Sequence, residues 1–184
     1  ATLGGKIFAA GLVGNDNAAK GLVGILQEKS VDVTGFIMDA NRSTISKTRI
    51  VAGGRTTVSQ QIVRVDKESK EPMGKAQEHR LEEYLKQVLP QVRGVVLSDY
   101  GSGTITDKLL GQIFAYCQEH NIPTIVDSRY DILRFKTIDY IKQNDAELST
   151  AIGRGLTTEE ELVQGGCELL VKMSAKGALI TRGE

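Results

Sequence analysis

The sequence contains no Trp, only five Tyr and four Phe, and no excess of either charge, since 23 Lys and Arg balance 23 Asp and Glu. Proteins that bind nucleic acid through their surface carry a basic patch or aromatic platforms for base stacking. A membrane-spanning helix needs about 20 consecutive apolar residues, and no run approaches that length. We therefore expect neither nucleic acid nor a membrane as a partner. The 184 residues, of which 40% are hydrophobic, suffice for one folded domain with a core.

The sequence has only two cysteines and two histidines. Cys117 and Cys167 lie far apart and match neither a zinc-ligand pattern nor a disulfide framework, which predicts a reducing, cytoplasmic location. No basic segment followed by an apolar core marks a signal peptide at the N-terminus. We expect both cysteines to be buried in helices, as small apolar side chains are. His79 and His120 lie among charged residues and are expected at the surface.

Short apolar runs alternate with amphipathic segments along most of the chain. Unbroken apolar runs separated by helical patterns are typical of a parallel sheet with helices on both faces. The predicted strands are 6–14, 94–100, 123–127, 140–143 and 177–181, and the predicted helices are 17–29, 75–92, 105–117 and 159–173.

The segment of about 34–66 differs in composition from the rest of the chain. It is rich in Val, Ile and Thr with interleaved polar residues, and Gly53 and Gly54 mark a turn. This pattern predicts an antiparallel hairpin region with strands at 34–40, 44–52 and 57–66 and one solvated face. We interpret it as an insertion outside the main sheet.

Polar residues follow four of the predicted strands. Ligands of open parallel sheets bind beyond the carboxyl ends of the strands, so these residues are the candidates for a binding site. Acids, an amide, a hydroxyl and glycines together suit a phosphorylated ligand. The candidates after the four strands are Asp99, Asp127, Asn144 with Glu147, and Thr181 with Gly183.

Asn144 and Glu147 are three residues apart at the start of a helix. They are suited to orient a Mg²⁺ ion that keeps its waters and binds phosphates. The alternative is that Asn144 is a helix N-cap and Glu147 completes a capping box. No Walker A motif, dinucleotide fingerprint or Ser-His-Asp arrangement accompanies them.

Several of these segments together resemble a known family. They are G-L-V-G-N-D at 11–16 with Gly21-Leu22, K-T-R-I at 47–50, Q-Q-I-V-R-V-D at 60–66, S-D-Y-G at 98–101, N-D-A-E at 144–147 and T-R-G at 181–183. In this order they resemble the motifs of the PfkB (ribokinase-like) carbohydrate kinases. The segments at 47–50, 60–66 and 98–101 are closest to the D-glycero-beta-D-manno-heptose-7-phosphate kinases of ADP-heptose synthesis.

The resemblance implies a ribokinase-like α/β fold and a transfer of the ATP γ-phosphoryl group to a sugar hydroxyl. Asn144 and Glu147 would then support Mg²⁺ and the phosphates, and Thr181 and Gly183 would lie along the nucleotide. Asp99 is the candidate for a sugar hydroxyl.

The resemblance also makes the 34–66 region a lid over the sugar. Arg49 and Arg64 are the candidates to bind a sugar phosphate, because a guanidinium group binds phosphate bidentately. The alternative is that they are exposed charges that keep a sheet edge soluble.

The 184 residues contain neither the family's glycine-rich sugar-binding motif G-G-x-x-x-N nor its G-A-G-D motif with the catalytic base. A lysine usual after the S-D-Y-G turn is Ser102 here. We therefore expect a partial kinase domain that is inactive by itself. A non-catalytic nucleotide-binding module, a homodimer through the hairpin region, and a kinase for another sugar are alternatives.

Overall fold

The computed structural model describes residues 1–53 and 58–183. Part of the predicted turn at Gly53-Gly54 therefore lies outside the described residues. The chain divides into two compact units, Ala1–Tyr84 and Leu85–Glu184. The described strands form three separate sheets, two of them parallel. No described helix is both long and apolar enough to cross a membrane.

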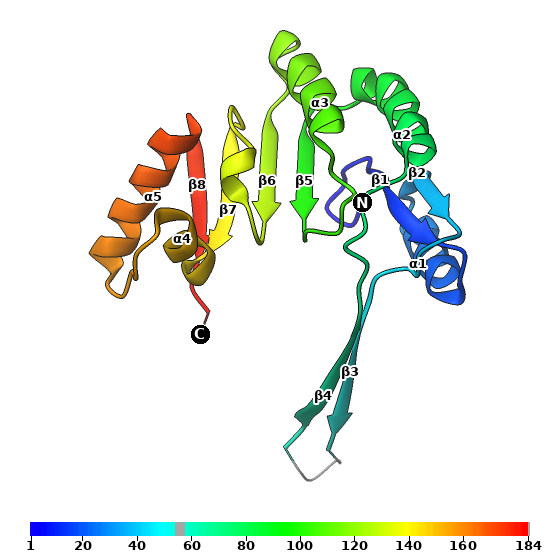
Figure 1. Ribbon diagram of the computed structural model, residues 1–184, viewed down its shortest axis with the longest axis horizontal. Coiled ribbons are helices and arrows are strands. Elements are labelled where there is room, and N and C mark those ends of the chain that lie inside the picture. Colours follow the sequence, from blue (N-terminus) through cyan, green and yellow to red (C-terminus); the bar gives the residue numbers. More distant parts are fainter. Residues whose placement is uncertain (54–57, 184) are drawn as a thin grey trace. The chain divides into compact units, whose positions relative to one another are not determined.

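The first unit contains a parallel strand pair, one helix and a separate ribbon (Figure 1). Strand β1 (Phe8–Gly14) pairs in parallel with β2 (Asp32–Asp39), and helix α1 (Asn17–Glu28) connects the two strands. The antiparallel ribbon consists of β3 (Ser46–Ala52) and β4 (Gln60–Lys67). Helix α2 (Lys75–Val88) follows, and the division between the units falls within it.

The antiparallel region is shorter than the predicted 34–66. The predicted strand 34–40 belongs to β2 and pairs in parallel with β1, so the ribbon begins only at Ser46. β2 and the ribbon differ in burial: Ile37 on β2 is only 4% exposed, whereas no described residue of β4 is buried. Alternating Val, Ile and Thr residues indicate a strand but carry no information on which strand pairs with it.

The second unit is a four-stranded parallel sheet with strand order β5-β6-β7-β8, drawn from green to red in Figure 1. Short 3₁₀ turns, η1 and η2, lie before β5 and after β6. The elements of this unit are η1 (Leu89–Gln91), β5 (Val95–Asp99), α3 (Asp107–Glu119), β6 (Thr124–Ser128), η2 (Ile132–Arg134), β7 (Tyr140–Asn144), α4 (Asp145–Ile152), α5 (Glu159–Met173) and β8 (Gly177–Thr181).

The two faces of this sheet differ in burial. On one face Leu97, Val126 and Ile141 are 6% exposed or less, whereas Val96 and Leu179 on the other are 70% and 63% exposed. Right-handed crossovers between strands in sequential order place their helices on a single face. Helices were expected on both faces of the sheet. Within the described residues, the crossover helices of this unit lie on one face.

Helix ends follow the local sequence. Asp16 caps α1, Thr106 caps α3, and Thr158 with Glu161 forms a capping box on α5. Gly165 lies within α5, where a Cβ atom would approach Leu156 Cδ1 to 2.7 Å. This close approach explains why a glycine is present here, although glycine within a helix ordinarily lowers helix stability.

The two cysteines differ in burial. Cys117 is buried in α3 as predicted, but the prediction is wrong for Cys167, which is exposed on α5. The buried stripe of α5 runs through Leu162, Gly166, Leu169 and Met173, and Cys167 lies one position beside it. No group of three potential metal ligands among His, Cys, Asp and Glu occurs in the part of the chain that the structure describes.

Candidate active site

The predicted strand-end residues of the second unit lie at the carboxyl edge of the four-stranded sheet. Asn144 ends β7 and is the register partner of Thr181, the last residue of β8. Gly183 follows two residues later and is exposed. The structure therefore brings Asn144, Glu147 and Thr181 together. Asp99 lies at the end of β5, the far strand of the same sheet.

Asn144 and Glu147 form a reciprocal capping box at the start of α4. The Glu147 amide donates to Asn144 Oδ1 at 2.7 Å, and the Asn144 amide donates to Glu147 Oε2 at 2.9 Å. Their capping interpretation is thus correct. The arrangement leaves Glu147 Oε1 without a hydrogen bond to any residue that the structure describes, so capping does not use the whole carboxylate.

This donor set fits Mg²⁺ in one way only. A single carboxylate oxygen beside an amide cannot form an all-protein cage, which needs several acidic ligands. Mg²⁺ commonly keeps its waters and is held by one or two carboxylates together with substrate phosphates. Glu147 fits that role, and it lies at the N-terminus of α4, where the helix dipole also favours phosphate oxygens.

An ion pair that the sequence did not indicate lies at the same edge. Lys142 on β7 is the register partner of Asp127 on β6, and Lys142 Nζ lies 3.2 Å from Asp127 Oδ2. The hydrogen bond to Asp127 raises the pKa of Lys142, and the nearby charge of Glu147 raises it further. Lys142 is therefore a fixed cation beside the Asn144–Glu147 pair. Two polar residues at matching strand positions were its only signal in the sequence.

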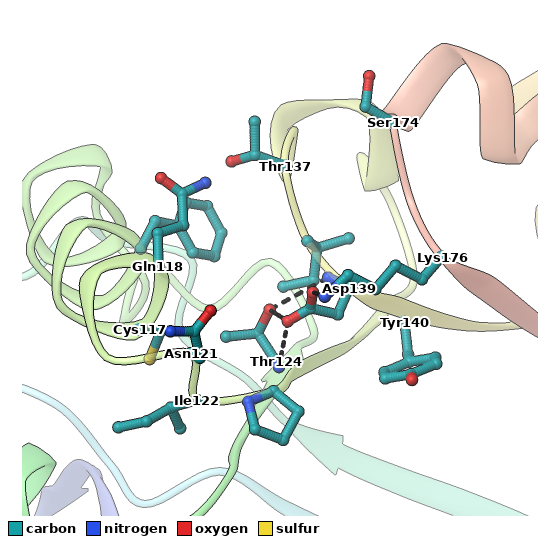
Figure 2. Close-up of a pocket in the computed structure, with 13 residues that line it drawn as sticks. Cys117, Gln118, Asn121, Ile122, Thr124, Thr137, Asp139, Tyr140, Ser174 and Lys176 are labelled. Carbon is teal, nitrogen blue, oxygen red and sulfur yellow. Dashed lines mark hydrogen bonds and ion pairs between the residues drawn. The ribbon is translucent and has the colours of Figure 1, made fainter.

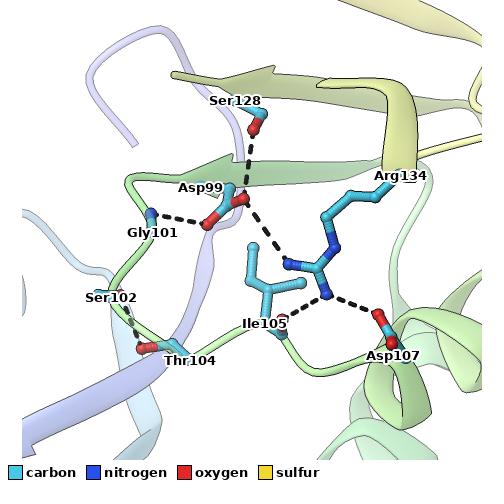
Figure 3. Close-up of polar contacts among 8 residues, drawn as sticks. All are labelled: Asp99, Gly101, Ser102, Thr104, Ile105, Asp107, Ser128 and Arg134. Atoms are coloured by element: carbon cyan, nitrogen blue, oxygen red, sulfur yellow. Dashed lines mark hydrogen bonds and ion pairs between the residues drawn. The ribbon is translucent and has the colours of Figure 1, made fainter. Parts of the chain in front are cut away.

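Asp99 is buried, and both of its carboxylate oxygens are engaged within the chain (Figure 3). Oδ1 accepts a hydrogen bond from the Gly101 amide at 3.0 Å, and Oδ2 accepts one from Ser128 Oγ at 3.2 Å. Arg134 Nη1 lies 4.0 Å from Oδ2. These contacts give Asp99 a role in shaping the turn that follows β5.

A cavity of about 380 Å³ lies at the opposite edge of the sheet, at the amino ends of the strands (Figure 2). Asp139 Oδ2 accepts hydrogen bonds from the Thr124 amide at 2.8 Å and from Thr124 Oγ1 at 2.9 Å, and Oδ1 lies 2.7 Å from Lys176 Nζ. Burial opposes ionisation of Asp139, but the bonds from Lys176 and Thr124 outweigh it and lower its pKa. This carboxylate joins β6, β7 and β8 and is satisfied without a ligand.

The first unit carries the two candidate arginines on its ribbon. Arg49 on β3 and Arg64 on β4 are exposed register partners, so their side chains lie on the same face of the ribbon. Arg64 Nε lies 2.9 Å from Asp66 Oδ1, whereas no acid pairs with Arg49 in the described ranges. Two like charges opposite each other are unfavourable, and an anion between them would relieve the repulsion.

The root of the ribbon is fixed by buried and half-buried polar groups. Thr44 donates to Asp16 through its amide at 2.9 Å and through Oγ1 at 2.7 Å, and it accepts from the Gly14 amide at 2.9 Å. Hydrogen bonds from the amides of Ala19 and Thr44, then from the Thr44 hydroxyl, lower the pKa of Asp16 to about 2. At Gly14 a side chain would clash with the Arg42 carbonyl oxygen.

Arg42 connects the segments on either side of the ribbon. Its Nε lies 3.2 Å from Asp39 Oδ2, and its Nη2 donates to the Glu71 carbonyl oxygen at 2.7 Å. The side chains of this ion pair are 6% and 9% exposed. Nothing local in the sequence indicates these contacts of Arg42 and Thr44, because their partners lie far away in the chain.

Comparison with known proteins places this chain among sugar kinases. The model of the pfkB family of carbohydrate kinases matches residues 1–184. The bifunctional protein HldE of Geobacter sulfurreducens is 32% identical over 183 residues, and that of Hyphomonas neptunium is 34% identical over 184. Each match covers 99% of this chain and only 36% or 37% of the relative. The chain thus spans about a third of the length of these curated relatives.

Solved structures agree in fold. Phosphofructokinase-2 from Escherichia coli, in complex with substrates and products, has a TM-score of 0.71 at 22% identity, covering 98% of this chain and 57% of that chain. Ribokinase from Arabidopsis thaliana, complexed with ribose and ATP, has a TM-score of 0.68 at 20% identity, covering 97% and 55%. The predicted ribokinase-like fold is confirmed. With a family model that matches its whole length, the chain belongs to the pfkB family of carbohydrate kinases.

Proposed function

We propose that this chain is part of an ATP-dependent kinase that phosphorylates a sugar or a sugar phosphate. The observation that carries the proposal is the pairing of Asn144 with Thr181 across β7 and β8, with Glu147 one helical turn further on. An amide and a hydroxyl at a helix N-terminus suit the phosphates of a nucleotide, and the half-free carboxylate suits the Mg²⁺ that accompanies them. Membership of the carbohydrate kinase family supports the same reading.

The strand-end residues would have separate roles in phosphoryl transfer, which depends on positioning the reactants and on neutralising phosphate charge. Glu147 and Asn144 would hold Mg²⁺, which when bound neutralises phosphate charge. Thr181 and Gly183 would contact the nucleotide, Thr181 through its hydroxyl and Gly183 through its backbone. Lys142 offers a second positive charge at this edge, held in place by Asp127.

The substrate that we propose is a sugar phosphate of the heptose 7-phosphate kind. It is supported by the ribbon sequence around Arg49 and Arg64, which resembles that branch, and by the unpaired state of Arg49 among the described residues. A guanidinium group without an acidic partner is ready to bind phosphate. A kinase for another sugar would leave the strand-end residues in the same roles and would not need Arg49.

The test is phosphorylation by the natural protein that contains these residues. Acceptor-dependent ADP formation is measured with ATP, Mg²⁺ and a panel of sugars and sugar phosphates. Glu147→Gln is expected to lower kcat by roughly 10- to 100-fold and to raise the Mg²⁺ concentration needed for half-maximal rate.

The matched control is Glu161→Gln, because Glu161 has the same capping-box position on α5. If Glu147 only caps its helix, both substitutions will lower stability and leave the rate unchanged. Glu161→Gln will then have the larger effect on stability, because Glu161 Oε2 also accepts from the amide and the hydroxyl of Thr157. Nucleotide binding without phosphorylation of any acceptor would instead favour a non-catalytic module.

A second proposal concerns assembly: the ribbon pairs with a second copy of the chain. Ile50, Val63 and Val65 share one face of the ribbon and are 44–52% exposed. An isolated two-stranded ribbon with an exposed apolar face is marginally stable and gains from being covered. Sedimentation velocity tests this proposal, and a chain that is monomeric at all concentrations would contradict it.

A further inference from the structure

The loop between β5 and α3, residues 100–106, lies at the carboxyl edge of the sheet and contains two glycines in the left-handed region. Gly101 has φ of 67° and Gly103 has φ of 72°. A side chain at Gly101 would also come within 2.9 Å of the Tyr130 ring. Glycine residues have many accessible conformations, so a single conformation of the loop depends on contacts that hold it. One contact lies within the loop, between Ser102 Oγ and Thr104 Oγ1 at 3.1 Å, and others come from outside it.

Arg134 supplies such contacts at both ends of the loop (Figure 3). Its Nη2 donates to the Ile105 carbonyl oxygen at 3.0 Å and to Asp107 Oδ1 at 2.7 Å, at the end where α3 begins. Its Nη1 lies 4.0 Å from Asp99 Oδ2, at the end where β5 stops. One guanidinium group therefore connects the two ends of the loop.

Asp99 completes the connection from the other side. Its two oxygens accept from the Gly101 amide and from Ser128 Oγ, and the Arg129 amide donates to the Asp99 carbonyl oxygen at 3.0 Å. The start of the loop is thus tied to the end of β6, and Arg134, from η2 after β6, ties the end of the loop to the same region. The side chains of Arg134 and Asp99 are 29% and 8% exposed, so solvent weakens this ion pair only in part. Asp107 is 94% exposed, so solvent screens its ion pair with Arg134 more strongly.

We infer that Arg134 is a positioning residue for the loop that begins beside Asp99, the candidate for a sugar hydroxyl, and through this loop for the acceptor. It holds the 100–106 loop in one conformation, so that the loop contributes to acceptor binding without first being ordered. The expected change in kinetics rests on the proposed function, whereas the expected effect on the loop does not. The planar fork of arginine is required, because three partners in different directions cannot be reached by the single ammonium group of lysine.

The test compares Arg134→Gln and Arg134→Lys with the unchanged protein by hydrogen–deuterium exchange and by kinetics. Amides of residues 100–106 are expected to exchange at least several-fold faster in both variants, with unchanged protection in β6 and β7. The KM for the acceptor is expected to rise about tenfold, the KM for ATP to stay the same, and kcat to change by less than about twofold.

Arg154→Gln is the matched control, because Arg154 also pairs with a carboxylate, Glu168 at 3.2 Å, but lies after α4. It is expected to leave both readouts unchanged. If the Arg134 variants do not fold, Asp107→Asn removes one of the three partners and is expected to give a smaller change in the same direction.

Unchanged exchange in the loop would overturn the inference, and so would faster exchange with an unchanged acceptor KM. A protein that phosphorylates no acceptor would overturn the proposed function, while the exchange experiment would still decide whether Arg134 orders the loop.

Discussion

Asp16 receives more hydrogen bonds than a helix cap needs. A typical N-cap accepts from one amide of the first turn, whereas Asp16 also accepts from the amide and hydroxyl of Thr44, which lies 28 residues further along the chain. The carboxylate thus joins the start of α1 to the segment that leads into the ribbon. All of these bonds stabilise the ionised form.

The stability that Asp16 contributes depends on pH in a defined direction. These hydrogen bonds lower the pKa of Asp16 from its ordinary 3.8 to about 2, so its contribution is fully present above pH 4 and is lost as pH falls toward 2. Asp16→Asn is expected to lower the melting temperature at pH 7, and the difference from the unchanged chain is expected to shrink as pH falls from 4 to 2. Thermal melts by circular dichroism measure it. A difference that grows over this range would contradict the role of the ionised carboxylate.

Among the elements, the ribbon of β3 and β4 has two faces of different chemistry. Lys47, Arg49, Arg64 and Asp66 share one face, and Ile50, Val63 and Val65 share the other. On the charged face Lys47 lies 2.8 Å from Glu68 Oε1 and 3.7 Å from Asp66 Oδ2, so much of the charge is already paired. We propose that the charged face binds a phosphorylated substrate and that the apolar face pairs with a second ribbon.

The apolar face allows a prediction about assembly. Val65→Lys is expected to raise the dissociation constant of the dimer at least about tenfold, because it places a charge where an apolar side chain would be covered. Val171→Lys is the control, since Val171 is 81% exposed on α5 and is the same substitution outside the ribbon. Sedimentation velocity across a concentration series gives both constants. Equal effects of the two substitutions would show that the ribbon is not the interface.

At the scale of the whole molecule, the chain belongs to the carbohydrate kinase family, but its 184 residues do not contain all of the family's motifs. The G-A-G-D segment with the catalytic base is not among the 184 residues, and Val96 and Leu179 leave one sheet face exposed. We propose that the chain is one part of a larger kinase.

The 184-residue polypeptide by itself is therefore expected to form no ADP above the acceptor-free background, whereas the natural protein that contains it does. A coupled ADP assay at matched concentrations compares the two. Robust turnover by the polypeptide alone would contradict the assignment of the base to a segment outside it. Circular dichroism of the same sample establishes that inactivity is not the result of unfolding.

Much of the fold was predictable because its signals are local. All four strands of the larger sheet were predicted, although the short segment at β7 also contains Lys142 and Gln143, and β8 has the predicted limits of 177–181. Asn144 with Glu147 was recognisable as a helix start, since a capping box involves residues three positions apart. The rule that ligands bind at the carboxyl ends of parallel strands then placed Asn144, Thr181 and Asp99 at one edge.

Other features depend on which distant segments meet, and local sequence does not encode that. Strand β2 pairs with β1, where the apolar face of β2 is covered, whereas the ribbon strands of similar composition stay exposed. Lys142 meets Asp127 only through strand register, and Arg134 reaches Asp99 and Ile105 only because η2 follows β6.

The sequence by itself thus determined the secondary structure, the residue types available for chemistry and the family resemblance, since each resides in short segments. The absence of Trp, of charge excess and of long apolar runs favours a small-molecule site over a nucleic-acid or membrane partner. Tertiary structure alone decided that Asp99 is already bonded on both oxygens, that Lys142 is a fixed cation, and that Arg134 connects the ends of a glycine loop. Those outcomes depend on distances between residues far apart in the chain, which only the packing of the strands sets.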